Sequence, residues 1–280
     1  MPKSQTILIT GATRGIGRAT ALHLARRGHR VLATGRAPDL LDSLGREAQA
    51  AALPLTVAPL DVRDSTALEN TVAKAVSDFG RLDALVNNAG FGIDGTYEEL
   101  TPQEVHGIFE TNFFAAVRLA QEVLPHMRRQ GSGTIVNVGS VAGLIAVPME
   151  GAYSATKFAM RAMSRSMRME VAPFGVRVVL IEPGVVRTDF HANKAIAQRA
   201  VQGDSPYAAM RKETQMRAKA RAIFGGQPLR TAMRVRQVIE ARSPAARYTV
   251  GLDAWAGGWA ARLVPDRVVD FFLRRAIMGR

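Results

Sequence analysis

The stretch TILITGATRGIGRATALHLARRG, residues 6–28, sets the expected fold of this chain of 280 residues. Its opening residues, 6–10, are apolar or β-branched and predict a short buried strand. A glycine-rich turn follows, and apolar residues then recur at roughly helical spacing until Gly28, which is typical of a helix end. The stretch therefore predicts a strand, a glycine-rich turn and a helix.

The same alternation continues through the first two thirds of the chain and returns near its end. Helix-like stretches include residues 101–130, which open with the capping-box signature TPQE, and residues 153–172. Such alternation predicts an α/β fold in which a doubly wound parallel sheet carries helices on both faces. We expect one domain, residues 1–280. Further strands are expected at residues 30–35, 55–60, 84–90, 134–140, 176–184 and 246–251.

The composition excludes several kinds of chemistry. The sequence contains no cysteine, which rules out disulfides, thiol catalysis and zinc–thiolate sites. Its five histidines show no metal-ligand spacing, so no metal site is expected. The chain begins without a signal-peptide pattern, and its most apolar long stretch, residues 133–149, is too interrupted to span a bilayer. We therefore expect a cytoplasmic protein.

The glycine-rich turn predicts a dinucleotide site. Gly11, Gly15 and Gly17 follow the first strand with the spacing G-x-x-x-G-x-G. Glycines let the backbone turn tightly and approach a pyrophosphate, which then lies at the positive end of the next helix. The Gly-Lys-Ser/Thr ending of a P-loop is missing. A plain turn is the alternative, but the position between strand and helix favours a Rossmann-type dinucleotide-binding domain.

The end of the second strand favours NADP(H) over NAD(H). An NAD site places an acid about 20 residues after the glycine turn, where it binds the ribose 2′-hydroxyl. Gly35 stands at that position, Arg36 follows it, and Arg14 adds a second cation from the turn. Two guanidiniums suit a 2′-phosphate, which arginine binds through paired hydrogen bonds. Binding of NAD(H), with both arginines simply solvated, is the alternative.

Further motifs follow in order along the chain. Asn112 lies 41 residues before Tyr153, and Ser140 lies 13 residues before it. The other motifs are TGATRGIG (10–17), LDV (60–62), NNAG (87–90), YSATK (153–157) and EPGVVRT (182–188). In this set the chain resembles the short-chain dehydrogenase/reductases over residues 5–190. Its C-terminal pattern is similar to the hydroxysteroid- and retinol-dehydrogenase-like subgroup.

The resemblance implies an NAD(P)-dependent oxidoreductase that acts on an alcohol or a carbonyl. Tyr153 is implied to be the general acid and base of the reaction. Lys157, on the same helix face, is expected to lower the pKa of Tyr153 and to bind the nicotinamide ribose. Ser140 is implied to hydrogen-bond the reacting oxygen, and Asn112 to support a water-linked proton path to Lys157.

The resemblance also carries over the contacts with cofactor and substrate. The implied cofactor contacts are Gly11, Thr13, Arg14, Gly15, Ile16, Gly17, Arg36, Asp61, Val62, Asn88, Ala89, Gly90, Tyr153, Lys157, Pro183, Val186 and Thr188. Ser140 and Tyr153 are the implied substrate contacts. The chain departs from the family pattern at Gly139 and Thr156, where serines are common, and neither residue is expected to touch a catalytic group.

The last third of the chain differs in charge from the rest. From Arg187 onward 18 Lys and Arg stand against 7 Asp and Glu, whereas the earlier residues hold 19 and 17. Residues 190–226 are expected to form a lid over a bulky apolar alcohol or carbonyl substrate, and residues 252–280 a helical tail. Apolar and basic residues of the tail suit either peripheral contact with an anionic membrane or packing within the protein. The expected assembly is a homodimer or homotetramer.

Two other functions stay open at this stage. Nucleic-acid binding would use the basic last third, but no recognition-helix, RNP or zinc pattern accompanies it, so no nucleic acid is expected. A non-catalytic NAD(P)-binding regulator would keep the glycine turn but would need none of the catalytic residues named above. An enzyme is therefore the favoured function.

Overall fold

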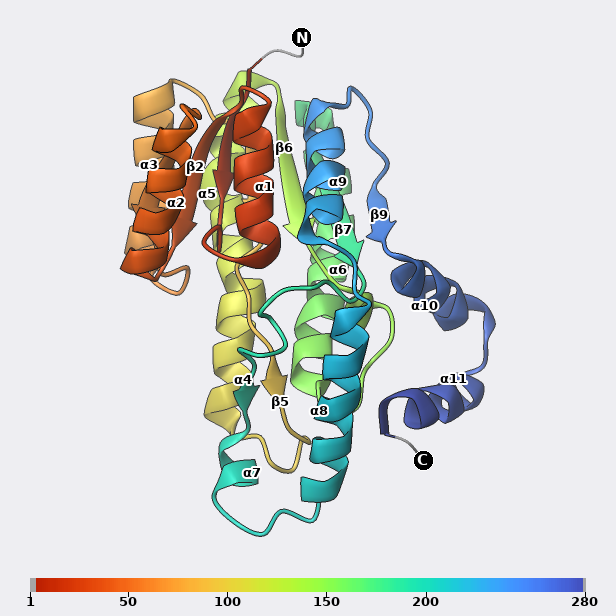
Figure 1. The fold of residues 1–280 in the computed structure, drawn as a ribbon. Helices are drawn as coiled ribbons and strands as arrows, with labels where there is room; N and C mark the ends of the chain where they lie inside the picture. The colour runs from red at the N-terminus through yellow and green to blue at the C-terminus, as the bar shows by residue number, and fades with distance from the viewer. Residues whose placement is uncertain (1–3, 279–280) are drawn as a thin grey trace.

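A seven-stranded parallel sheet runs through the centre of the protein (Figure 1). The computed structural model describes residues 4–278, apart from the side chains of residues 260–262. The strands lie in the order β3-β2-β1-β4-β6-β7-β9, which confirms the doubly wound α/β fold. The strands of this sheet are β1 (Thr6–Ile9), β2 (Arg30–Gly35), β3 (Leu55–Pro59), β4 (Ala84–Asn87), β6 (Gly133–Val138), β7 (Val176–Pro183) and β9 (Arg247–Val250).

The strand order reverses beside β1, and this reversal positions the site. The chain first builds β2 and β3 on one side of β1, then returns to build β4, β6, β7 and β9 on the other side. The loops that follow β1 and β4 therefore diverge and leave a crevice at the carboxyl ends of the strands. The glycine turn follows β1 and the NNAG motif follows β4, so both predicted motifs lie at this crevice.

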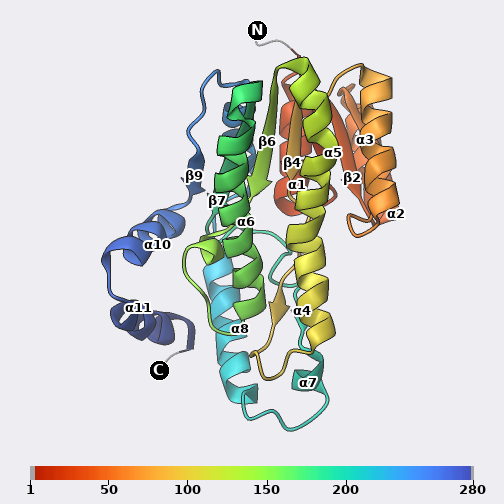
Figure 2. The same ribbon diagram turned by 180° about the vertical axis from the view of Figure 1, so that it is seen from behind.

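Helices cover both faces of the sheet, with α1, α2 and α9 on one face and α3, α5 and α6 on the other (Figures 1 and 2). Ile7 and Ile9 of β1 belong to the apolar core on one face, and Leu8 belongs to the core on the other. Strands that are buried on both faces read as nearly continuous apolar runs, as this sequence does. These helices are α1 (Gly15–Arg26), α2 (Pro38–Ala50), α3 (Ser65–Phe79), α5 (Ala115–Gln130), α6 (Gly151–Val171) and α9 (Pro228–Glu240).

One continuous helical segment runs from Pro102 to Gln130 and changes from α-helix to π-helix and back in its middle. Thr101 and Glu104 form the predicted capping box at the start of α4 (Pro102–Phe109). A single π-helical turn, η1 (Glu110–Phe114), then joins α4 to α5 without a break. Such turns are frequent at functional sites, and this one holds Asn112.

Residues 190–226 fold beyond the carboxyl end of the sheet, over the crevice. They contain a short strand, β8 (Ala195–Ile196), and the helices α7 (Gln198–Val201) and α8 (Ala208–Ile223). The strand β8 pairs in parallel with β5 (Ile93–Asp94), which follows the NNAG motif. This second, two-stranded sheet attaches the late segment to the crevice.

Basic residues of the last third also pair with acidic residues of the first two thirds. The Lys194 ammonium lies 3.1 Å from an Asp94 carboxylate oxygen and also contacts Glu150. Further pairs of this kind are Arg211 with Glu99 at 2.9 Å and Arg247 with Glu182 at 3.4 Å. The uneven charge of the sequence therefore serves in part to attach residues 190–226 and β9 to the rest of the fold.

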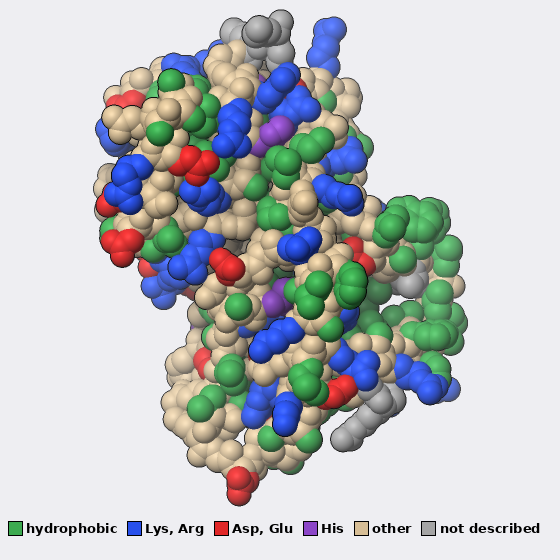
Figure 3. Space-filling view, in the orientation of Figure 1, with side chains coloured by type: hydrophobic (Ala, Val, Ile, Leu, Met, Phe, Trp, Pro, Cys, Tyr) green, Lys and Arg blue, Asp and Glu red, His purple; other side chains and the backbone are tan. Residues whose placement is uncertain are grey.

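Residues 252–278, here called the C-terminal arm, project away from the body of the protein (Figure 1). The arm consists of α10 (Leu252–Leu263), α11 (Asp266–Leu273) and the π-helical turn η4 (Arg274–Met278), and η4 returns to contact α8. Apolar side chains gather on its outer surface (Figure 3). None of the helices within residues 4–278 combines the length and the hydropathy that crossing a bilayer requires.

Candidate active site

The glycine turn forms a tight backbone cradle. Gly11 and Gly15 have φ values of +61° and +51°, which side chains other than glycine rarely adopt. A Cβ on Gly17 would lie 2.2 Å from the carbonyl oxygen of Gly11, so this position has no room for one. The Asn88 amide donates to the carbonyl oxygens of Thr10 and Gly11, both at 3.0 Å, and fixes the turn to the end of β4.

The cradle fits the diphosphate of a dinucleotide. It ends at the N-terminus of α1, where Arg14 makes no side-chain capping bond to the first N–H groups of the helix. Uncapped N–H groups and the helix dipole together favour an anion at this position. The fit supports the assignment made from the glycine spacing alone.

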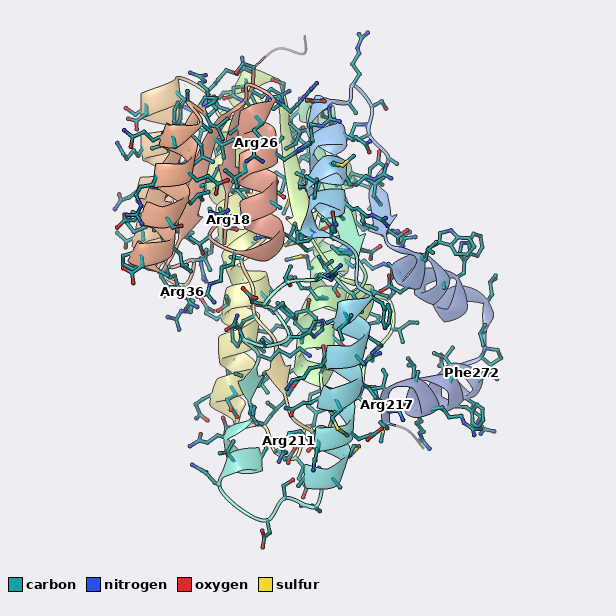
Figure 4. All side chains as sticks on the ribbon, in the orientation of Figure 1. Arg18, Arg26, Arg36, Arg211, Arg217 and Phe272 are labelled. Carbon is teal, nitrogen blue, oxygen red and sulfur yellow. The ribbon has the colours of Figure 1, made fainter. Side chains whose placement is uncertain are left out.

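The crevice wall beyond β2 is open and basic. Gly35 packs on Thr13, and a Cβ on Gly35 would lie 2.5 Å from the Thr13 methyl carbon. Arg36 is exposed beyond the end of β2, where Figure 4 labels it, and Arg14 is exposed on the glycine turn. Gly35 has no side chain that could bind a ribose 2′-hydroxyl. Among the described residues, no acidic side chain lines the cavity at this end in its place.

Asp61 and the nearby Asp64 have different roles at the start of α3. The Arg63 guanidinium lies 2.6 Å from a carboxylate oxygen of Asp61, and its hydrogen bonds to Asp61 lower the pKa of that carboxyl to about 2. The neighbouring Asp64 caps helix α3, accepting from the N–H of Ala67 at 3.0 Å. Asp61 is therefore not a helix cap, and it stays ionised at the edge of the crevice.

Ser140, Tyr153 and Lys157 meet at the end of β6. Ser140 follows this strand, and Tyr153 and Lys157 lie one turn apart on the buried face of α6. The Lys157 ammonium donates to the carbonyl oxygen of Val138 at 2.9 Å and lies 5.6 Å from the centre of the Tyr153 ring. A hydrogen bond joins the hydroxyl groups of Ser140 and Tyr153.

The pKa values in this group differ from the sequence-based expectation. We expected the Lys157 ammonium to lower the pKa of Tyr153. Burial instead raises the pKa of Tyr153, and the hydrogen bond from Ser140 offsets only part of this effect. Burial also lowers the pKa of Lys157, to about 8. The expectation failed because both groups are buried, and burial disfavours the charged form of each.

Asn112 is fully buried, and protein groups satisfy its amide. Its Oδ1 accepts from the N–H of Phe91 at 3.0 Å, and its Nδ2 donates to the carbonyl oxygen of Phe91 at 2.9 Å. A longer bond of 3.3 Å joins Nδ2 to the Thr156 hydroxyl on α6. The expectation that Thr156 touches no catalytic group was therefore wrong for Asn112, because the π-helical turn brings Asn112 against α6.

One cavity of about 580 Å³ contains most of the predicted site. Gly17, Asp61 and Asn112 support its walls from outside, and the described residues contain no cluster of acidic or histidine side chains that could hold a metal ion. The predicted residues that line it are Gly11, Thr13, Arg14, Gly15, Ile16, Arg36, Val62, Asn88, Ala89, Gly90, Ser140, Tyr153, Lys157, Pro183, Val186 and Thr188.

The sequence analysis missed several residues that line the same cavity. The Phe190 ring packs 5.4 Å from the Tyr153 ring, measured between centres, and His191 packs 5.7 Å from Phe190. The charged residues that were missed are Glu150, one residue before α6, Asp189, which follows Thr188, and Arg221, in the last turn of α8. None of them belongs to a motif. Their only sequence signal was position: Glu150 is close to Tyr153, Asp189 directly follows EPGVVRT, and Arg221 lies inside the expected lid.

Comparison with known proteins identifies the family. The chain belongs to the short-chain dehydrogenases, whose family model, described as short chain dehydrogenase, matches residues 5–199. It is thus an NAD(P)-dependent oxidoreductase with a Rossmann-type fold. A short-chain dehydrogenase from Streptomyces avermitilis has the same fold, with a TM-score of 0.81 and 31% identity over 98% of this chain and 97% of that one.

Two further similar proteins extend this comparison. The chain is 33% identical over 275 residues to a 3-ketodihydrosphingosine reductase of Bacteroides thetaiotaomicron, and the match covers 96% of this chain and 97% of the relative. It is 39% identical over 199 residues to the Homo sapiens retinol dehydrogenase 8, and that match covers 69% of this chain and 62% of the relative. The first similarity spans nearly the whole chain, including its last third.

Proposed function

We propose that the protein is an NADP(H)-dependent oxidoreductase that interconverts a bulky apolar alcohol and its ketone or aldehyde. The observation that carries this proposal is that Ser140, Tyr153 and Lys157 line the same cavity as the glycine turn. The nicotinamide, when bound there, supplies or accepts the hydride. The cavity walls keep the substrate and the proton donor together.

Tyr153 holds the transferred proton at its phenol oxygen. Because burial raises the pKa of Tyr153, the phenol stays protonated at neutral pH and is ready to donate to a carbonyl oxygen. The hydrogen bond between Ser140 and Tyr153 brings two hydroxyl donors to one place, where they stabilise negative charge on that oxygen. The nearby Lys157 ammonium stabilises the phenolate that remains after donation. Asn112 supports a water-linked proton path by holding η1 against α6.

The apolar part of the cavity favours a bulky substrate. Phe91, Val141, Val147 and Phe190 line it near Tyr153, and residues 190–226 act as the lid that covers them. Two relatives are named for acting on 3-ketodihydrosphingosine and on retinol, both of which are largely hydrocarbon molecules. The proposed substrate is therefore a lipid-, retinoid- or steroid-like alcohol or carbonyl compound.

Preference for NADP(H) rests on the basic crevice wall. Arg14 and Arg36 are both exposed there and make no ion pair with any described carboxylate, so their guanidiniums are free to bind a 2′-phosphate. Gly35 leaves no carboxylate to repel that phosphate. The proposal therefore ranks NADP(H) above NAD(H).

The C-terminal arm is proposed to contact an anionic membrane surface from the cytoplasmic side. Its outer surface exposes Trp255, Trp259, Phe271 and Phe272, and the arginine Arg275 lies over the Phe271 ring at 5.4 Å. Aromatic and basic side chains side by side suit the headgroup region of a bilayer, where an apolar substrate also gathers. Packing of the arm in a homodimer or homotetramer is the competing use of the same surface.

Tyr153→Phe tests the proposed chemistry. The change removes the proton donor and leaves the ring in place, so the rate of NADPH-dependent carbonyl reduction should fall by at least about 100-fold with little change in NADPH affinity. Tyr97→Phe, which removes the hydroxyl of an exposed tyrosine, is the matched control and should change neither quantity. Near-normal turnover of the Tyr153 variant would show that another group donates the proton.

Arg36→Ala tests the cofactor preference. Loss of one charge-assisted contact with the 2′-phosphate should raise the NADPH dissociation constant about 10-fold or more and leave that of NADH within about twofold. Arg46→Ala removes the same charge from an exposed position on α2 and should leave both constants unchanged. Fluorescence titration gives both constants. Tighter binding of NADH than of NADPH by the unaltered protein would contradict the preference.

Co-sedimentation with vesicles tests the proposed membrane contact. The protein should pellet with vesicles that contain phosphatidylserine, but not with pure phosphatidylcholine, and added salt should weaken the binding. The double change Trp259→Ser and Phe272→Ser should abolish it, whereas Met169→Ser, an exposed apolar residue on α6, should not. A protein that ignores anionic vesicles at low salt, or loses its oligomeric state in the double variant, would assign the arm to subunit packing.

A further inference from the structure

Arg221 lines the cavity far from Arg14 and Arg36 in the sequence and, like them, has no ion-pair partner among the described residues. Arg221 projects from the last turn of α8, is partly buried and lines the cavity together with Glu150, His191 and Ala218. Within residues 4–278 it forms no ion pair, although many other basic residues of the last third do. A partly buried guanidinium without a carboxylate partner is costly in a folded protein and therefore calls for an explanation.

The hydrogen-bonding groups of Arg221 are also mostly unused. Among the described residues, its one acceptor is the carbonyl oxygen of Arg217 on the same helix, which its Nε–H reaches at 3.4 Å. The terminal amino groups of the guanidinium have no hydrogen-bond acceptor among residues 4–278. Arginine offers these groups as a planar fork that matches a carboxylate or a phosphate.

The two carboxylates whose charges act on Arg221 have other partners. Glu150 contacts the Lys194 ammonium, which Asp94 also binds at 3.1 Å. Asp253 accepts the N–H of Val185 at 2.6 Å, in the loop after β7. Burial lowers the pKa of Arg221, and the charges of Glu150 and Asp253, neither of which forms an ion pair with it, oppose that effect. Neither fills the guanidinium fork.

His191, which lines the same cavity, supplies a second unused group. Its Nδ1 is buried and has no hydrogen-bond partner among the described residues. Burial, reinforced by the Lys194 ammonium, lowers the pKa of His191, so the neutral ring has one N–H to donate at neutral pH. The ring contacts Phe190, which in turn contacts Tyr153, so the centres of the His191 and Tyr153 rings are at most about 11 Å apart, the sum of the two contacts.

We propose that Arg221 and His191 form a subsite for an oxyanion, a carboxylate or a phosphate monoester, carried by the substrate at the end away from its reacting carbonyl. The inference rests on the proposed function, and it narrows the substrate from a wholly apolar molecule to an apolar one with an acidic end. Phe190 and the apolar wall near Tyr153 hold the hydrocarbon part, while α8 of the lid supplies the cation.

Calorimetric titration of the enzyme with saturating NADP⁺ tests this subsite without requiring turnover. The probes are decanoate, decyl phosphate and the neutral decanamide. We expect decanoate or decyl phosphate to bind at least about 10-fold more tightly than decanamide, as one charge-assisted contact allows. Whichever of the two binds more tightly identifies the oxyanion. In Arg221→Gln the advantage over decanamide should disappear.

A matched variant makes the result specific. Lys219→Gln removes the same charge from an exposed position on α8 and should keep the preference for the anionic probe. The readout is binding to the NADP⁺ complex and needs no turnover, so a failure of the proposed proton transfer would not disturb this test. Equal binding of acid and amide by the unaltered protein would overturn the subsite. Equal weakening of all probes in Arg221→Gln would do the same, and would make Arg221 a packing residue of the cavity wall.

Discussion

The hydrogen bond from the Lys157 ammonium to the carbonyl oxygen of Val138, 2.9 Å long, is the constraint on which the site depends. It ties α6 to the last residue of β6. As a result Ser140, which follows β6, and Tyr153, which lies on α6 one turn before Lys157, face each other. The turn after β6 also packs closely on α6, since a Cβ on Gly143 would lie 2.8 Å from the backbone oxygen of Lys157. Burying an ammonium in this way is unfavourable, which is why the pKa of Lys157 falls to about 8.

A second constraint acts from the other side of the crevice, where residues 190–226 are held down by charge. Lys194 is almost completely buried between Asp94 and Glu150, and Arg211 pairs with the buried Glu99. In these pairs, basic residues of the last third meet acidic residues of the nearly neutral first part. Arg221 takes part in none of these pairs. Part of the basic charge of the last third therefore serves to hold the late segment over the crevice.

Local patterns carried most of the fold and much of the site. The strands were predictable because burial on both faces makes them continuous apolar runs, and the glycine turn because its backbone leaves no room for side chains. The pKa of Tyr153 was not predictable, since the i, i+4 spacing shows that Lys157 is near but not that both groups are buried. Arg221 and His191 could not be found for a related reason. Their role depends on which acids are already paired, and Glu150 and Asp94 acquire their partner Lys194 only when β8 joins β5.

The pH dependence of NADPH-dependent carbonyl reduction tests most directly whether Ser140, Tyr153 and Lys157 work as one proton-transfer unit. Below pH 8 Lys157 carries the charge that stabilises the phenolate left on Tyr153, and above it this charge is lost, because burial sets its pKa at about 8. Tyr153 itself stays protonated through that range, since its pKa is raised. The rate should therefore decline along a single alkaline limb with an apparent pKa near 8. A rate that stays constant to about pH 10 would contradict the assignment.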